Sequence, residues 1–387
     1  MPPATLTITP EQLRYFRAQR GFLVGPGAAD PVQCARKILG AQAQVESCAL
    51  HALSMRTAPD ADGHRPTAAA LTALIAEGTH PLVRTWGQRG TLHLYDQRDL
   101  PLMNAGSQAW ATSGRRGGFP DEAVVAQMAE VFEAHGGPMT RADLIPHIPE
   151  AYVDTLTDHP AVQGKPAHFA ATRLIWCLAR RGDIVFARKQ GSTQAYVHRR
   201  HWCPDLKWAP YGVFEAHGRI GLRYLSAFGP ASLRDIAYHL GAKISEVRKW
   251  GKAFAGEVVW CRCGDRSELM VLRPDVEALQ APVGPWPTRL LPAYDTALMG
   301  HKDKGLILPN AAEESLVWKR AAVVSATVIA EGQIAATWSH KKKGKTVSVT
   351  VSPLSLWRDS LMPEVEAEAQ AFAHHLGLTL SAVDITR

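Results

Sequence analysis

Two glutamines near the N-terminus lie two positions apart, in the stretch Gly40-Ala41-Gln42-Ala43-Gln44. A glutamine amide is no general base at any useful pH, but its carbonyl accepts hydrogen bonds and its NH2 donates them. Such a pair can hold a water molecule and orient a second group without abstracting a proton. Without further context, a Q-x-Q sequence is more typical of residues that cap or solvate a helix. Other features of the chain are needed to choose between these two alternatives.

Basic side chains gather at two places along the chain. One lies on a predicted helix and hairpin, where eight basic residues stand against one acid, Asp183: Lys165, Arg173, Arg180, Arg181, Arg188, Lys189, Arg199 and Arg200. This pattern favours phosphate contacts, and the alternative is a solvated basic face. The other is the predicted tip of a hairpin, with Lys341, Lys342, Lys343 and Lys345 around a glycine. A polyanion would relieve the repulsion among these ammonium groups and release counterions.

A third group of polar residues lies on a hairpin predicted over 82–95, where Arg84, Arg89 and His93 stand near two glycines. We expect these side chains to contact DNA phosphates. The alternative is that both arginines are solvated and that His93 is a satisfied structural histidine. Trp86 on the same hairpin is interpreted as a core residue.

Composition and cysteine usage narrow the class of protein. The chain has 387 residues and a net charge of +7, which suits an anionic partner such as nucleic acid. The N-terminus does not resemble a signal peptide, and no apolar stretch is long enough for a membrane span, so we expect a cytoplasmic, nucleoid-associated protein. Six scattered cysteines indicate reduced thiols. No Cys/His/Asp cluster suggests a metal, and no lysine stands out as a nucleophile, so a cofactor-free, monofunctional mechanism is the simplest interpretation.

An internal repeat indicates how these residues are positioned. The stretches 137–144 and 229–236 both read G-P-x-[ST]-x-x-D-[LI], each after a predicted helix (121–135 and 217–228). Thr140 or Ser232 should cap the next helix, with an acid three residues later as in a capping box. Each copy continues into a helix (167–182 or 244–254) and a hairpin (183–200 or 257–274). Helices followed by a hairpin are typical of a winged helix, which places a helix in the major groove.

The remaining segments complete the predicted architecture. Helices over 30–44 and 67–78, followed by the hairpin 82–95, predict a third, divergent winged helix. From about residue 286 the chain is β-branched and glycine-punctuated, with strands expected within 314–332, 333–354 and 377–385 and one helix at 362–377. We therefore predict an α+β fold: winged helices at 1–120, 121–205 and 206–285, then a β-barrel-like domain at 286–387.

These motifs together resemble the winged-helix DNA glycosylase family typified by AlkZ and YcaQ. The Q-x-Q pair, the R-G-T-x-H hairpin, the G-P repeat and the segment Leu291-Pro292-Ala293-Tyr294-Asp295 follow in the family's order. The resemblance implies three winged helices and a β-barrel around a DNA channel, with Gln42 and Gln44 at the catalytic centre. Tyr294 and Asp295 are carried over as DNA contacts. The family's Tyr-Arg-Asp-Arg is replaced here by residues 301–304, His-Lys-Asp-Lys.

The chemistry implied by the resemblance suits an amide pair. An N7-alkylated guanine is cationic and leaves without a general acid, so a positioned water can capture the oxocarbenium-like sugar. We expect a monomeric enzyme that acts on double-stranded DNA with alkylated bases. Bulky adducts or crosslinks are included, because residues 33–56 contain no Phe, Tyr or Trp that would build a tight base pocket. The alternative is a non-enzymatic winged-helix DNA-binding protein, such as a regulator or a repair accessory factor.

Overall fold

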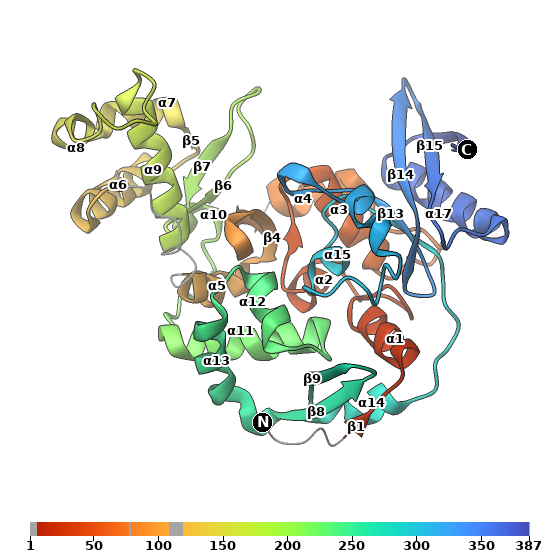
Figure 1. Cartoon of the computed structure of the whole chain (residues 1–387). Coiled ribbons are helices and arrows are strands. Elements are labelled where there is room, and N and C mark those ends of the chain that lie inside the picture. Colours follow the sequence, from red (N-terminus) through yellow and green to blue (C-terminus); the bar gives the residue numbers. More distant parts are fainter. Residues whose placement is uncertain (1–5, 77–78, 80, 108–118, 387) are drawn as a thin grey trace. The chain divides into compact units, whose positions relative to one another are not determined.

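The computed structural model describes residues 6–76, 79, 81–107 and 119–386. It divides into two compact units, the first formed by Met1–Thr72 and His217–Arg387 and the second by Ala73–Ala216. The boundaries fall within helices α4 (Ala68–Ala76) and α11 (Val213–Phe228). Helices and strands occur in both units, so the predicted α+β class is confirmed (Figure 1). No helix in the described part of the chain has the length and apolar character to cross a bilayer.

The N-terminal part of the first unit carries the Q-x-Q stretch between two helices. Its elements are β1 (Leu6–Thr7), α1 (Pro10–Arg20), α2 (Pro31–Lys37), β2 (Ala41–Gln42) and α3 (Glu46–Arg56). The prediction of one helix over 30–44 was wrong beyond Lys37. Leu39 and Gly40 adopt left-handed φ angles of 60° and 88°, and the Gly40 N–H closes the helix on the Ala35 carbonyl at 2.8 Å. The chain then runs extended through Ala41–Gln42.

The second half of the first unit begins with helices and a hairpin in the predicted order. These are α11, α12 (Leu233–Leu240), α13 (Ile244–Gly251), β8 (Val258–Cys263) and β9 (Arg266–Leu272), with β1 pairing parallel to β8. Ser232 caps α12: its hydroxyl accepts from the Asp235 N–H at 3.2 Å, and the Asp235 carboxylate accepts from the Ser232 N–H at 2.9 Å. The predicted capping box is confirmed.

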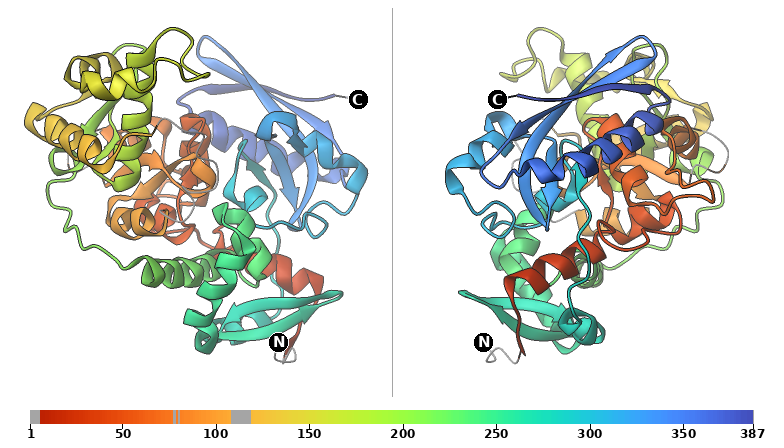
Figure 2. Two further views of the ribbon diagram at one scale, coloured as in Figure 1. Left: turned by 60° about the vertical axis from the view of Figure 1, so that its left-hand side comes forward. Right: turned by 90° about the vertical axis from the view of Figure 1, so that its right-hand side faces the viewer.

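A five-stranded sheet forms the C-terminal part of the first unit. Its order is β10 (Arg289–Leu291), β13 (Thr327–Ala330), β14 (Gln333–Lys343), β15 (Thr346–Pro353) and β16 (Thr379–Ile385). All pairs are antiparallel except β15–β16, which are joined through α17 (Met362–His375). Figure 2 shows α17 against the sheet, and Phe372 and Val365 of α17 share a buried core with Val349 and Trp338.

Two details of this region differ from the prediction. Among the described strands, β10 and β16 stay at the two edges of the sheet, so pairing that would close a barrel is not found there. The stretch expected to be strand from residue 314 begins as a helix, α16 (Glu314–Val317), before the short strands β11 (Trp318–Lys319) and β12 (Val323–Val324). Two short helices, α14 (Val276–Gln280) and α15 (Thr296–Met299), complete the described elements of this unit beside its 3-10 turns.

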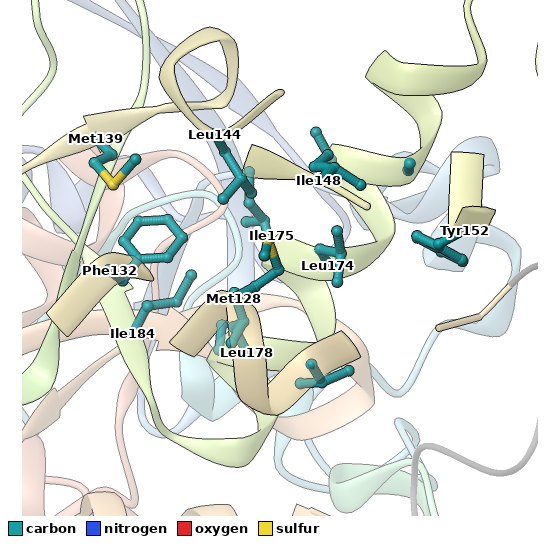
Figure 3. Close-up of a cluster of buried hydrophobic side chains, with 14 of the residues drawn as sticks. Met128, Phe132, Met139, Leu144, Ile148, Tyr152, Leu174, Ile175, Leu178 and Ile184 are labelled. Carbon is teal, nitrogen blue, oxygen red and sulfur yellow. The ribbon is translucent and has the colours of Figure 1, made fainter. Parts of the chain in front are cut away.

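The second unit packs helices on its five strands, which belong to one sheet. The strands pair antiparallel in the order β4 (Leu92–Asp96), β3 (Leu82–Trp86), β6 (Ile184–Phe186), β7 (Ala195–His198) and β5 (Met139–Thr140). Its helices are α5 (Leu100–Ser107), α6 (Glu122–His135), α7 (Arg141–Leu144), α8 (Glu150–Asp154), α9 (Pro166–Arg181) and α10 (Arg199–Trp202). Phe132 of α6 and Leu174 of α9 meet Ile184 in the core (Figure 3). Thr140 and Asp143 form the second capping box, as predicted.

Candidate functional site

The two glutamines of the Q-x-Q stretch lie between α2 and α3, Gln42 in the extended strand β2 and Gln44 in the bend that leads into α3. Alternate residues of an extended chain project to opposite sides. Ala41 and Ala43 are completely buried, while Gln42 is 7% exposed and Gln44 is exposed. The alanine side of the segment therefore faces the core, and the two amides lead from the interior to the surface. A continuous helix would have separated residues i and i+2 by about 200°.

Helix α3, which directly follows this segment, is fixed by a buried ion pair. Its last residue, Arg56, donates two hydrogen bonds to the Asp295 carboxylate at 2.8 and 2.6 Å, and the two side chains are 1% and 0% exposed. The guanidinium also donates to the carbonyls of Gly21 and Ala52 at 2.9 and 3.1 Å. The same carboxylate accepts from the Ala297 N–H at 2.9 Å and so caps α15.

This geometry favours a structural role for Asp295 over the predicted contact with DNA. A carboxylate without exposed surface, held by a guanidinium and a helix N-terminus, cannot reach a phosphate and would repel one. Tyr294 beside it has a left-handed φ of 61° and packs half-buried on the core of this region. Cys48 of α3 hydrogen-bonds the backbone of Ala293. The loop thus runs along α3, and the role of Tyr294 stays a prediction.

An aromatic cluster joins α3 to the sheet and to α17. His51 of α3 lies 4.7 Å from Phe372, 5.5 Å from His375 and 5.9 Å from Trp338, measured between ring centroids. Burial lowers the pKa of His51 well below its usual range, so the ring is neutral. Trp338 belongs to β14, the strand that ends in the lysine cluster. One core therefore supports both α3, the helix that follows the Q-x-Q stretch, and the basic hairpin.

The four lysines of the predicted hairpin are brought together as expected. Lys341, Lys342 and Lys343 end β14, Lys345 lies in the turn to β15, and all four are exposed. Gly344 between them has a φ of 58°, which the tight turn requires. The tip thus presents a concentrated positive charge to solvent.

The hairpin β3–β4 of the second unit does not present all three of its predicted contacts. Arg84 and Arg89 are partly exposed, and the Arg84 guanidinium lies 5.4 Å from the ring centroid of Phe186. His93 is 1% exposed, and its Nδ1 lies 3.1 Å from the Thr91 carbonyl. Burial, helped by the charge of Arg89, lowers the pKa of His93 to about 3. A neutral, buried imidazole offers no charge to a phosphate, so the structural alternative is favoured for His93.

The four basic residues predicted to bind DNA between 188 and 200 differ in whether their charge is already paired with an acid. Arg188 and Lys189 are exposed in the turn between β6 and β7. Arg199 is paired with Asp183 at 3.1 Å, and its guanidinium lies 4.2 Å from the Trp208 ring centroid. Arg200 is ion-paired with Glu133 but remains exposed. The prediction of a phosphate contact is thereby weakened for Arg199, whose charge is already compensated. Trp86 packs on the core of this unit beside Phe186, as interpreted from the sequence.

Sequence reasoning missed Arg56, the side chain that ties α3 to the loop at 293–295. Its only signal was a lone arginine at the end of a helix whose last eight residues are mostly apolar, which suggests a paired charge but not the partner. None of the six cysteines forms a disulfide, and burial raises the pKa of Cys34, Cys203 and Cys261 to about 12, so these thiols are unreactive. In the described part of the chain, no three His, Cys, Asp or Glu side chains gather as metal ligands would.

Comparison with known proteins shows to which class this fold belongs. The solved structure of Streptomyces sahachiroi DNA glycosylase AlkZ superposes with a TM-score of 0.81 at 21% identity, over 98% of this chain and all (100%) of that chain. The fold is therefore one that a DNA glycosylase adopts. Residues 35–375 match the family model described as DNA glycosylase AlkZ-like, and the chain belongs to this family.

A relative of known sequence agrees with this assignment. The protein named interstrand DNA cross-link repair glycosylase, from Streptomyces sahachiroi, is 26% identical over 390 residues, which cover 97% of this chain and 98% of the relative. The resemblance drawn from the sequence motifs is confirmed. Of the two classes that the sequence left open, the protein is an enzyme, a DNA glycosylase, and not a non-enzymatic DNA-binding protein.

Proposed function

We propose that this DNA glycosylase hydrolyses the N-glycosidic bond of cationic N7-alkyl purines in duplex DNA, with the attacking water held by Gln42 and Gln44. The observation that carries the proposal is the non-helical segment between α2 and α3, in which the two amide residues pass from the buried Gln42 to the exposed Gln44 while Ala41 and Ala43 are packed in the core. The amide of Gln44 meets the DNA, and that of Gln42 lies deeper, where bulk water is excluded.

Hydrolysis of this glycosidic bond needs little more than a water molecule positioned by the two amides. The alkylated base carries the positive charge that makes it a good leaving group, so no general acid is required. The sugar cation that forms is captured by a water molecule whose position, and not its basicity, sets the rate. An amide carbonyl can accept a hydrogen bond from that water while its NH2 orients a neighbouring group. The mechanism is monofunctional, and no lysine nucleophile takes part.

An open site explains why bulky lesions should be accepted. The segment from Gln33 to Arg56 contains no Phe, Tyr or Trp that would close on a small base. The relative from Streptomyces sahachiroi is named for interstrand crosslink repair. We therefore include bulky N7 adducts and crosslinks among the substrates.

Duplex binding is assigned to the exposed basic groups and to winged-helix units. Helices followed by a hairpin recur at 121–205 and 206–285, with the same capping box in each. Together with a divergent copy within 1–120, they form the proposed DNA-reading part. The basic tip of β14–β15, in the β-rich region 286–387, contacts phosphates.

Excision from a duplex with one N7-methylguanine tests the proposal. Abasic sites are revealed by heat or alkali under single-turnover conditions. Gln44→Ala and Gln42→Ala should slow excision by about 100-fold, while duplex affinity stays within a few-fold. Gln280, an exposed glutamine at the end of α14, gives the matched control Gln280→Ala, which should excise like the wild type.

A substrate panel completes this test. A duplex with a bulky N7 adduct should be cleaved, and duplexes with uracil or 8-oxoguanine should be poor substrates because their bases are neutral. Wild-type rates in both glutamine variants would remove the catalytic assignment. Brisk release of uracil without release of the cationic bases would show that the proposed chemistry is wrong.

A further inference from the structure

Val45 follows Gln44 directly and is the N-cap residue of α3. Its backbone is extended, with φ −112° and ψ 106°, and no side-chain hydrogen bond caps the helix. The residue is 42% exposed and lies in the partly exposed turn 44–48, between the buried stretches Ala41 to Ala43 and Ala49 to Arg56. An apolar side chain therefore projects into solvent next to the more exposed amide of the Q-x-Q pair.

Neither helix stability nor core packing accounts for a valine at this position. Ser, Thr, Asp and Asn are favoured at the N-cap because their side chains accept from a backbone N–H of the first turn, and valine is among the poorest choices. In this chain that preference is followed at five helices, by Thr9, Asp30, Asp121, Thr140 and Ser232, whereas α9, α13 and α17 also begin without a side-chain cap. Val45 gives up the cap and also leaves much of its isopropyl group in water.

The support below Val45 is rigid. The last eight residues of α3 are buried, and Arg56 is locked to Asp295. Cys48, three residues after Val45, is hydrogen-bonded to the backbone of Ala293, and His51 packs in the aromatic cluster. Valine itself has one restricted side-chain torsion, so little entropy is lost when it is pressed against a partner. An apolar side chain held in place in this way can displace a group that it contacts, because the side chain itself does not move aside.

We propose that Val45 is a wedge that contacts the face of the base pair beside the damaged nucleoside. This inference rests on the proposed function of Gln42 and Gln44. Water held by these amides reaches the glycosidic carbon only if the lesion is displaced from its position in the stack, which costs unstacking energy. Apolar side chains of DNA-bending proteins supply such a wedge between base steps. The isopropyl group would be removed from water on contact with the base, which favours the displaced state.

The test measures unstacking separately from excision. A duplex carries N7-methylguanine with 2-aminopurine as its neighbour, a base whose emission rises when it is unstacked. Wild-type protein and Gln44→Ala should both raise the emission on binding, whereas Val45→Ser should not. Val213→Ser is the matched control, because Val213 is a 40% exposed valine at the start of α11. It should behave like the wild type.

Excision rates and stability give the second readout. Val45→Ser should slow excision about tenfold or more from a paired lesion. It should slow excision much less from a lesion in a mismatch, where less unstacking is needed. Because serine restores the N-cap, the variant should melt at a higher temperature than the wild type, which excludes misfolding as the cause. An undiminished emission rise in Val45→Ser, or equal slowing on paired and mismatched lesions, would overturn the wedge. If wild-type protein unstacks the neighbour but releases no N7-methylguanine, the proposed function fails and the wedge stands.

Discussion

Replacement of Asp295 by alanine should be among the most destabilising single changes in the first unit. The carboxylate accepts two hydrogen bonds from Arg56 at 2.8 and 2.6 Å, and neither side chain has more than 1% of its surface exposed. Removing one partner of a buried pair leaves the other charge uncompensated, which costs about 3–5 kcal/mol. Loss of the α15 cap adds about 1 kcal/mol. The sum is a large part of the stability of an ordinary domain.

Urea unfolding of the full chain, followed by tryptophan fluorescence, measures this cost. Asp265, an exposed aspartate of the same unit, gives the control Asp265→Ala, whose free energy of unfolding should change by less than about 0.5 kcal/mol. The double variant Arg56→Met/Asp295→Leu should be more stable than Asp295→Ala, because no unpaired charge remains buried. A loss below about 1 kcal/mol in Asp295→Ala, together with weaker duplex binding, would refute the reasoning and return Asp295 to the DNA contacts.

Two further predictions concern the basic hairpin and the buried histidine. Replacing Lys341, Lys342, Lys343 and Lys345 by alanine should weaken binding to all duplexes and reduce the slope of log K against log salt by roughly one for each lost phosphate contact. Lys319→Ala, a change at another exposed lysine of the same unit, is the control, and an unchanged slope in the quadruple variant would mean that the tip does not meet DNA. Burial lowers the pKa of His93 to about 3. Between about pH 3 and pH 6.5, His93 is therefore protonated in the unfolded chain but neutral in the folded protein. The contribution of His93 to the free energy of unfolding should therefore be fully present above about pH 6.5 and decrease as the pH drops toward 3. The loss at pH 5 should be about 2 kcal/mol. Unfolding of wild type and His93→Gln at pH 7 and pH 5 checks this, and equal pH dependence of the two proteins would contradict it.

The local structure of this protein could be predicted from the sequence where short-range signals decide it. Gly-Pro followed by Thr140 or Ser232, with an acid three residues later, defines a helix start through contacts within one turn, and both capping boxes are present. The hairpins around Gly90, Gly264 and Gly344 were found for the same reason, since a tight turn depends on a few adjacent residues. The ordered motifs also sufficed to identify the family, which the comparisons confirmed.

What each polar side chain does was decided by contacts far apart in the sequence. Arg56 and Asp295 are 239 residues apart, and only their meeting in the core turns a predicted DNA contact into a buried ion pair. His93 and Arg199 looked like phosphate ligands by composition, yet the fold buries one and pairs the other with Asp183. The end of α2 at Lys37, by contrast, has a local cause that apolar periodicity alone does not show: Gly40 takes a left-handed φ and its N–H caps the helix on the Ala35 carbonyl. Burial and pairing depend on the whole chain, whereas turns and caps depend on neighbours.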